Sequence, residues 1–286
     1  MKNLYTVACG LLLLSATSVM AQDALTMQDI NFNRFNYNTA FIAEKNESGL
    51  SLTNTNGGAV QNTGQLNFTA YTQLKSAQIA IGTHINSKYF GLYRTSSFEL
   101  DFAKSIKLSE NSILMAGLGL GLQFTSIRTG ELNQYVDQAD PMLATGVFPQ
   151  YRFVNSLGLG YIWKDKLTAG ISLPSFAKTE STFNPIFIAN GSYKIVANQD
   201  LTIIPELLLF GTGVKPFSAE INSKAIYKDK VWVKLGYRTT NTFVGALGVN
   251  LSGFSIGYAY NAYYQEFRTI IPRTHNINIT FQIAGK

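Results

Sequence analysis

Apolar and polar side chains alternate with a period of two residues along most of this chain. Between residues 231 and 238, for example, Val231, Val233, Leu235 and Tyr237 occupy every second position. Successive side chains of an extended strand point to opposite faces, so this pattern predicts a strand with one apolar face. The positions between them are mostly small, polar or charged, which predicts a second face of opposite character.

The alternating segments divide the chain into about fourteen candidate strands. Each has close to the 9–11 residues that a tilted strand needs to cross a membrane, and an even number suits a closed bacterial barrel. No convincing amphipathic helix accompanies them. The predicted strands are 49–56, 64–74, 77–86, 92–104, 112–126, 152–163, 166–174, 185–196, 200–211, 217–227, 230–240, 242–251, 253–263 and 273–284.

The predicted connections fall into two classes of length. Short turns follow the even-numbered strands, in QLKSAQ, KLSENS, WKDKL, VANQDL, YKDKV and NLSGF. Longer connections follow odd-numbered strands, at 127–151, 174–184 and 264–272, with 239–241 as a short exception. Bacterial outer-membrane barrels have short periplasmic turns and longer outer loops. The sequence therefore predicts that the short turns and both termini share the periplasmic side.

Composition decides between two folds that could accommodate these apolar faces. A sandwich of two packed sheets would bury them in a protein core, whereas a closed barrel would turn them to lipid. Hydrophobic residues make up 46% of the chain, but charged residues only 14%, against roughly 25% in soluble domains. A soluble sandwich would carry more surface charge. We therefore predict an all-β, closed antiparallel transmembrane barrel in the bacterial outer membrane, in contact with outer-membrane lipid.

The first 21 residues have the pattern of a secretory signal peptide. Lys2 precedes an apolar block, and Val19-Met20-Ala21 supplies a small-residue cleavage site. Cys9, the single cysteine, comes before most of that block, which disfavours a lipoprotein signal. The predicted organisation is a removed signal at 1–21, an N-terminal periplasmic segment at 22–48 and the barrel at 49–286.

The net charge gives no support to a nucleic-acid partner. Removal of Lys2 leaves 22 basic residues against 17 acidic ones, a net charge of +5 without a long basic run. Export also separates the mature chain from nucleic acid.

Residues that could carry chemistry are sparse. The glycines of GLGLGL, residues 117–122, lack the spacing and the following helix of a nucleotide loop, so they predict a small-residue barrel wall. His84 and His275 have no neighbouring ligands at metal spacing. A hydrolase acting on lipid would need a serine beside a histidine at one rim, and nothing in the sequence places one there. We expect no catalytic residue, cofactor or metal site.

Charged residues of both signs fall on the predicted inner faces of the strands. Such a mixture favours internal ion pairs or a wet lumen, and it permits a small-solute, porin-like channel as an alternative function. The predicted lumen-facing charges are Glu99, Asp101, Lys166, Glu206, Glu220, Lys224, Lys234 and Arg238.

The most distinctive segments lie near the N-terminus and in the C-terminal half. The run QDINFNRFNYNTAFIAE occupies residues 28–44. Later segments are FPQYRFVNSLGLGYIWKDKLTAGISLP, GSYKIVANQDLTIIPELLL, KDKVWVKLGYRT, VGALGVNL, FSIGYAY and THNINITF. Together they resemble the PorP/SprF family of type IX secretion system outer-membrane proteins, with Thr39 where that family usually has proline.

The resemblance implies a barrel that does no bond-making chemistry. It implies work with the type IX translocon and periplasmic secretion components, to help cargo such as adhesins cross or attach to the outer membrane. On this basis we expect the segment 22–48 to contact periplasmic partners and the connection 127–151 to face cargo or the cell surface. The predicted partner-binding residues are Asp29, Phe32, Phe35, Tyr37, Asn38 and Phe41.

Overall fold

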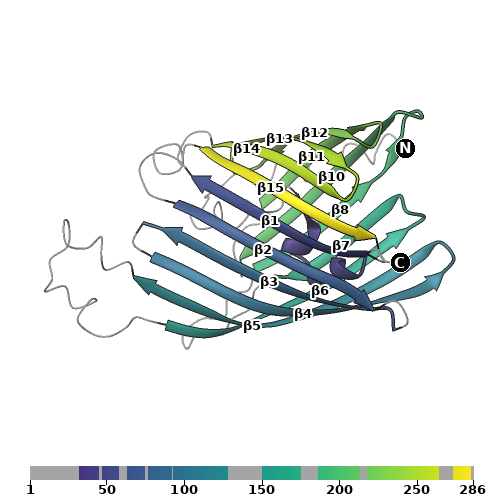
Figure 1. Cartoon of the computed structure of the whole chain (residues 1–286). Coiled ribbons are helices and arrows are strands. Elements are labelled where there is room, and N and C mark those ends of the chain that lie inside the picture. The colour runs from purple at the N-terminus through teal and green to yellow at the C-terminus, as the bar shows by residue number, and fades with distance from the viewer. Residues whose placement is uncertain are drawn as a thin grey trace, which may run out of the picture.

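A computed structural model shows the chain as a closed antiparallel β-barrel (Figure 1). Consecutive strands pair around the ring, except that β8 and β9 both pair with β10, and β15 returns to β1, so the ring has no free edge. The prediction of a closed transmembrane barrel is confirmed. The structure describes residues 32–44, 47–57, 63–74, 77–91, 93–127, 150–174, 186–212, 218–263 and 273–284.

The strands lie within a few residues of their predicted bounds. They are β1 (Glu47–Gly57), β2 (Thr63–Leu74), β3 (Ile79–Phe90), β4 (Tyr93–Ser109), β5 (Ser112–Ile127), β6 (Gln150–Trp163), β7 (Leu167–Leu173), β8 (Ile186–Tyr193), β9 (Ile195–Val196), β10 (Leu201–Thr212), β11 (Ser218–Tyr227), β12 (Val231–Arg238), β13 (Thr242–Leu251), β14 (Phe254–Tyr263) and β15 (Arg273–Ala284).

Two of these labels, β8 and β9, share one position in the ring. Glu206 of β10 pairs with Ser192 of β8, and Ile203 pairs with Ile195 of β9, in the same register. The interruption lies opposite Pro205, which has no backbone N–H to donate to the ladder. The barrel therefore has fourteen strand positions, as predicted.

Side chains alternate between lipid and lumen along the strands. In β12, Val231, Val233 and Leu235 are 47%, 47% and 65% exposed, whereas Lys234 and Arg238 are 3% and 1% exposed. Charge on the lipid side of a barrel costs about 2–4 kcal/mol for Lys or Arg at the membrane midplane, which fixes this parity. The apolar face of the repeating pattern is the one that meets lipid.

The short turns gather at one end of the barrel, the right-hand end in Figure 1. They follow β2, β4, β6, β9, β11 and β13, and β1 begins and β15 ends there. The longest intervals between strands, after β5, β7 and β14, lie at the other end. Short connections after β3 and β12 also lie there, one more than predicted. We call the short-turn end the periplasmic end, as in bacterial outer-membrane barrels.

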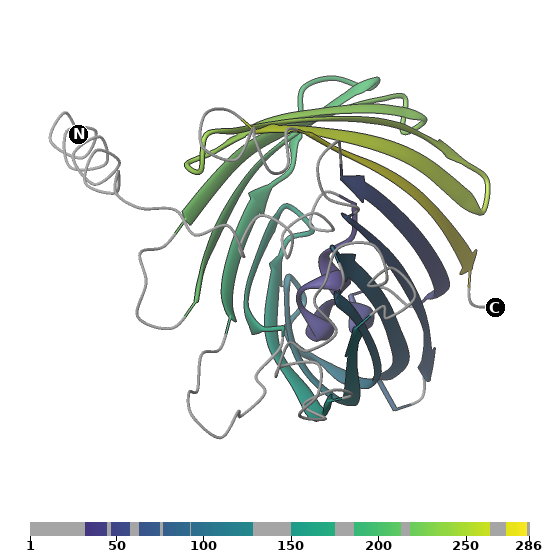
Figure 2. The same ribbon diagram turned by 90° about the vertical axis from the view of Figure 1, so that its left-hand side faces the viewer.

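A segment from the N-terminal region lies inside the ring (Figure 2). It forms two short 3₁₀ helices, η2 (Arg34–Asn36) and η3 (Thr39–Ala43). All five residues of η3 are buried, and the helix packs against β2 to β6. Among the described residues, no helix has the length and apolarity to cross a membrane. We call residues 32–44 the plug; its contacts with the inner wall form the core of the protein.

Arginine substitutions at two outward positions of β12 should separate lipid burial from other effects. Leu235→Arg, in the middle of the strand, should lower the free energy of unfolding by about 2–4 kcal/mol, and Val231→Arg, beside the periplasmic turn, by about 0–1 kcal/mol. Urea unfolding in phospholipid vesicles measures both. Equal losses for the two variants would contradict the assigned position of the membrane.

Candidate functional site: the lumenal plug and its cavity

Hydrogen bonds tie the plug to several sides of the barrel wall. Asn33 donates to a serine hydroxyl in β1 at 2.7 Å, and Arg34 donates to a serine hydroxyl in β8 at 2.8 Å. The side chain of Asn38 donates to backbone carbonyls of β6 and β7 at 3.0 and 3.3 Å. Because these strands lie on different sides of the ring, the plug spans the lumen.

Glycines on the inner faces of β5 and β6 make room for the plug. A Cβ on Gly117 would lie 2.5 Å from the backbone nitrogen of Ala40, and a Cβ on Gly158 would overlap Oδ1 of Asn38. The GLGLGL run is therefore a small-residue barrel wall, as predicted, with a specific role in plug packing that the sequence did not reveal.

Apolar contacts complete the packing of the plug. Tyr37 packs with apolar side chains of β8 and β10, Phe41 with β5 and β6, and Ile42 with alanines of β3 and β4. Removal of apolar surface from water stabilises such contacts by roughly 25 cal/mol per Å². Burial also raises the pKa of the Tyr37 phenol well above its ordinary value, so the hydroxyl stays neutral.

A chain of oxygen atoms links the plug to a carboxyl group on the wall. The hydroxyls of Thr39 and Ser156 lie 2.7 Å apart, and Ser156 donates to the carboxylate of Glu99. Gly119 leaves the space in which Glu99 and Ser156 meet. Asp101, the next inner position of β4, is also buried. Proline at position 39 could not supply this hydroxyl, so this contact depends on Thr39.

Ion pairs occupy the opposite wall of the lumen. Arg238 donates from Nε to Glu220 Oε2 at 2.7 Å, and the two side chains are 1% and 0% exposed. Lys234 Nζ lies 2.8 Å from Glu206 Oε2. Buried charges have to be paired in this way, because an isolated one would lose its hydration without compensation.

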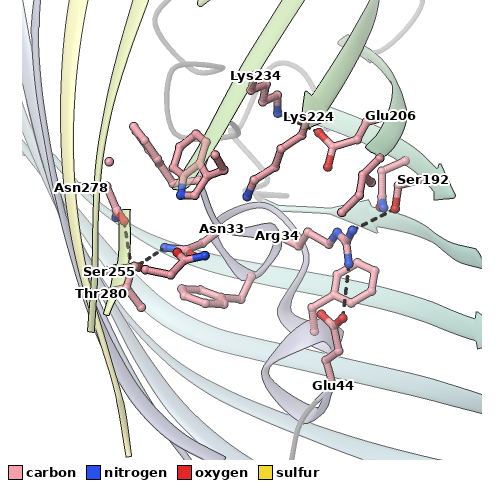
Figure 3. A pocket seen from close by; sticks show the side chains of 18 of the residues that line it. Asn33, Arg34, Glu44, Ser192, Glu206, Lys224, Lys234, Ser255, Asn278 and Thr280 are labelled. Carbon is pink, nitrogen blue, oxygen red and sulfur yellow. Dashed lines mark hydrogen bonds and ion pairs between the residues drawn. The ribbon is translucent and has the colours of Figure 1, made fainter. Parts of the chain in front are cut away.

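A cavity of about 500 Å³ lies mainly between the plug and the wall formed by β8 and β10 to β15 (Figure 3). Its lining reaches Asp229 in the β11–β12 turn, so it extends to the periplasmic end. Lys224 points into it, with Nζ 4.3 Å from the ring centre of Trp232. Arg34 bridges Glu44 and Ser192 at its edge. The arrangement can bind polar groups, and among the described residues that line it no nucleophile lies beside a base.

The structure places the predicted lumen-facing charges in three groups. Glu99 and Asp101 lie beside the plug on β4, and five others lie on β10, β11 and β12. Those five are Glu206, Glu220, Lys224, Lys234 and Arg238. Lys166 is the exception, because β7 begins at Leu167; Lys166 is exposed in the β6–β7 turn, and its predicted inward position is wrong.

The predicted partner-binding residues require a larger correction. Tyr37, Asn38 and Phe41 are 7%, 1% and 3% exposed within the barrel, so they have no free surface for a periplasmic partner. Phe32 and Phe35 line the cavity. Of the predicted periplasmic segment 22–48, residues 32–44 are thus a lumenal plug, and residues 47 and 48 begin β1. Asp29 and most of the connection 127–151 lie outside the described residues.

The two histidines lie on opposite faces of the barrel wall. His84 is on an inner face, opposite Glu99 of β4. His275 is on the outer face, where its Nδ1 lies 2.7 Å from the hydroxyl of Tyr258. Across the described residues, no three side chains of metal-binding type gather into a possible site.

Comparison with known proteins identifies a family. The model of the "Type IX secretion system membrane protein PorP/SprF" family matches residues 19–281, which confirms the resemblance found in the sequence. No curated protein sequence matches the chain.

Solved structures share the fold at low sequence identity. The TodX monoaromatic hydrocarbon channel deltaS2 mutant has a TM-score of 0.53 and 10% identity, covering 87% of this chain and 93% of that one. The outer membrane protein Omp33 of Acinetobacter baumannii has a TM-score of 0.50 and 8% identity, covering 83% and 99%. At these identities the likeness shows an outer-membrane barrel fold alone.

A methyl group at the plug-facing glycine should disturb the plug. Gly117→Ala should lower the free energy of unfolding by about 1–3 kcal/mol, because its Cβ meets plug backbone that cannot rotate away. Gly191→Ala is the matched control, since its Cβ would have no neighbour within 4 Å. Urea unfolding in vesicles gives both values. A wild-type midpoint for Gly117→Ala would argue against close packing of the plug on β5.

Breaking the buried ion pair should cost far more than breaking an exposed one. Arg238→Met should destabilise the barrel by about 3–5 kcal/mol, because it leaves the Glu220 carboxylate buried without its partner. Adding Glu220→Gln should recover part of that loss. Lys228→Ala, from the exposed pair with Asp200, should cost about 1 kcal/mol or less. Similar losses for Arg238→Met and Lys228→Ala in the same unfolding assay would refute the assignment.

Proposed function

Because the chain belongs to the PorP/SprF family of type IX secretion system membrane proteins, we propose that it aids the secretion or surface attachment of cargo proteins by protein–protein interaction. In this role it binds partners and performs no bond-making chemistry. Its partners are the type IX translocon, periplasmic secretion components and a secreted cargo or adhesin. The family match over residues 19–281 is the observation that carries this proposal.

The plug inside the lumen supports an interaction role over a solute channel. The plug contacts strands around the ring and is held there by hydrogen bonds, fitted glycines and apolar packing. A channel needs a continuous wet path, whereas a scaffold needs only stable surfaces at its two ends. The wall ion pairs at Lys234 and Arg238 also hold much of the lumen charge in fixed contacts.

Loss of the whole chain should reduce the amount of type IX cargo on the cell surface and in the medium. The expected loss is severalfold, restored by the wild-type chain, while uptake of small polar solutes stays unchanged. Immunoblots of surface and medium fractions measure secretion, and radiolabelled sugars measure uptake.

Reconstitution provides the independent comparison. The purified barrel in planar bilayers should show no steady open-pore current, because the plug occupies the lumen. A steady current together with undiminished cargo secretion in the deletion strain would favour the solute-channel alternative.

A further inference from the structure

Two periplasmic turns of the barrel have the same sequence pattern. Trp163-Lys-Asp-Lys-Leu167 connects β6 to β7, and Tyr227-Lys-Asp-Lys-Val231 connects β11 to β12. Each has an aromatic residue, the triplet Lys-Asp-Lys and an aliphatic residue. The overall fold requires only that these strands be joined tightly, so it does not explain why the triplet recurs.

The two turns also share one conformation. The central residues have positive φ in both: 52° and 51° for Lys164 and Asp165, and 51° and 55° for Lys228 and Asp229. The backbone N–H of the last lysine donates to the aromatic carbonyl at 3.0 Å in each turn. The first lysine lies over the preceding ring in each, 4.8 Å from the Trp163 centroid and 5.4 Å from the Tyr227 centroid. The turns are structural copies.

Glycine and asparagine adopt this backbone conformation at a lower free-energy cost than lysine. Two-residue hairpin turns with both φ values positive favour Asn-Gly, because glycine has no Cβ and asparagine tolerates the left-handed region. Lysine in that region costs roughly 1–2 kcal/mol. The chain accepts this strain in both turns and places charged side chains there, which indicates that the charges themselves are useful.

The turns present these charges to water at the periplasmic end. All six triplet residues are exposed. Trp163 and Tyr227 mark the level of the membrane interface, where aromatic rings prefer to lie, and the triplets extend beyond it. Four strand-to-strand steps, each about 4.8 Å, separate the turns by roughly 20 Å along the rim. Five lysines and three aspartates occupy this arc: Lys164, Lys166, Lys194, Lys228, Lys230, Asp165, Asp200 and Asp229.

We propose that the lysines of the two Lys-Asp-Lys turns form one docking surface for the acidic face of a folded periplasmic protein. This inference rests on the proposed interaction role and names a surface and the partner chemistry for it. The roughly 20 Å spacing suits a folded partner that touches both turns at once. The cavity opens beside the second turn through Asp229.

Substitutions that separate charge from turn geometry test this surface. The lysine variant combines Lys164→Asn and Lys228→Asn, which suit the left-handed conformation, with Lys166→Gln and Lys230→Gln. The aspartate variant combines Asp165→Gly and Asp229→Gly; it keeps all four lysines and relieves strain. Both should fold, and the aspartate variant should unfold at higher urea concentration than the wild type.

Photo-crosslinking in living cells provides the readout. A photoreactive residue replaces Gln199, which is exposed in the turn between β9 and β10, midway between the two triplets. The wild type and the aspartate variant should form adducts with a soluble protein of acidic isoelectric point, and the lysine variant about tenfold fewer. Binding of the purified adduct partner to the barrel in nanodiscs should weaken as salt is raised.

Several results would overturn the proposal. They are adducts to lipid alone, equal adducts in the lysine variant, or loss of adducts only in the aspartate variant. Vesicles of phosphatidylglycerol and of phosphatidylcholine, mixed with the nanodiscs, identify binding to anionic headgroups. Suppose that deletion of the whole chain stops secretion but the lysine variant secretes and crosslinks like the wild type. That result would contradict the docking surface and leave the proposed function intact. If deletion leaves secretion intact, the proposed function itself fails.

Discussion

The need to pair every backbone N–H and C=O group inside hydrocarbon governs this structure. It forces the strands into a ring, and the ring of fourteen positions closes through the pairing of β1 with β15. Among the described strands, one weak point lies opposite Pro205, where a donor is missing and the pairing is interrupted between β8 and β9 without a change of register. Closure in turn fixes which face of each strand meets lipid.

A ring of this size creates a second requirement, because it encloses more space than the side chains of eight-stranded barrels must fill. The plug meets that requirement on one side of the lumen. Gly117 and Gly158 remove wall side chains where η3 lies, and Asn38 and Thr39 supply hydrogen bonds to that wall. On the other side of the lumen, the ion pairs of the wall and the cavity occupy the space that the plug does not fill. The lumen therefore has a packed half and a polar half.

Sequence alone predicted the barrel closely because lipid imposes a strict two-residue period, and the strand bounds and the apolar face of β12 follow from it. No periodic pattern of this kind marks the plug in the sequence. Residues 32–44 mix asparagine with aromatic residues in no regular period, and their partners lie up to 247 residues away in the chain. The one available hint was the series of glycines facing one side of β5. The predicted inward position of Lys166 was wrong because the two-residue alternation does not show at which residue a strand begins.

The placement of charge fits the proposed interaction role of a barrel whose lumen holds a plug. Buried charges such as Glu220 and Arg238 are held in mutual pairs, so they stabilise the wall and are unavailable to partners. The charges of the two Lys-Asp-Lys turns are exposed, and the first two residues of each triplet have positive φ, in positions where uncharged residues would fit with less strain. A protein that acted through its lumen would be expected to concentrate its accessible charge there. In this chain four lumenal charges are held in ion pairs, whereas the charges of the two Lys-Asp-Lys turns are exposed at the periplasmic rim, where the surface of another protein can reach them.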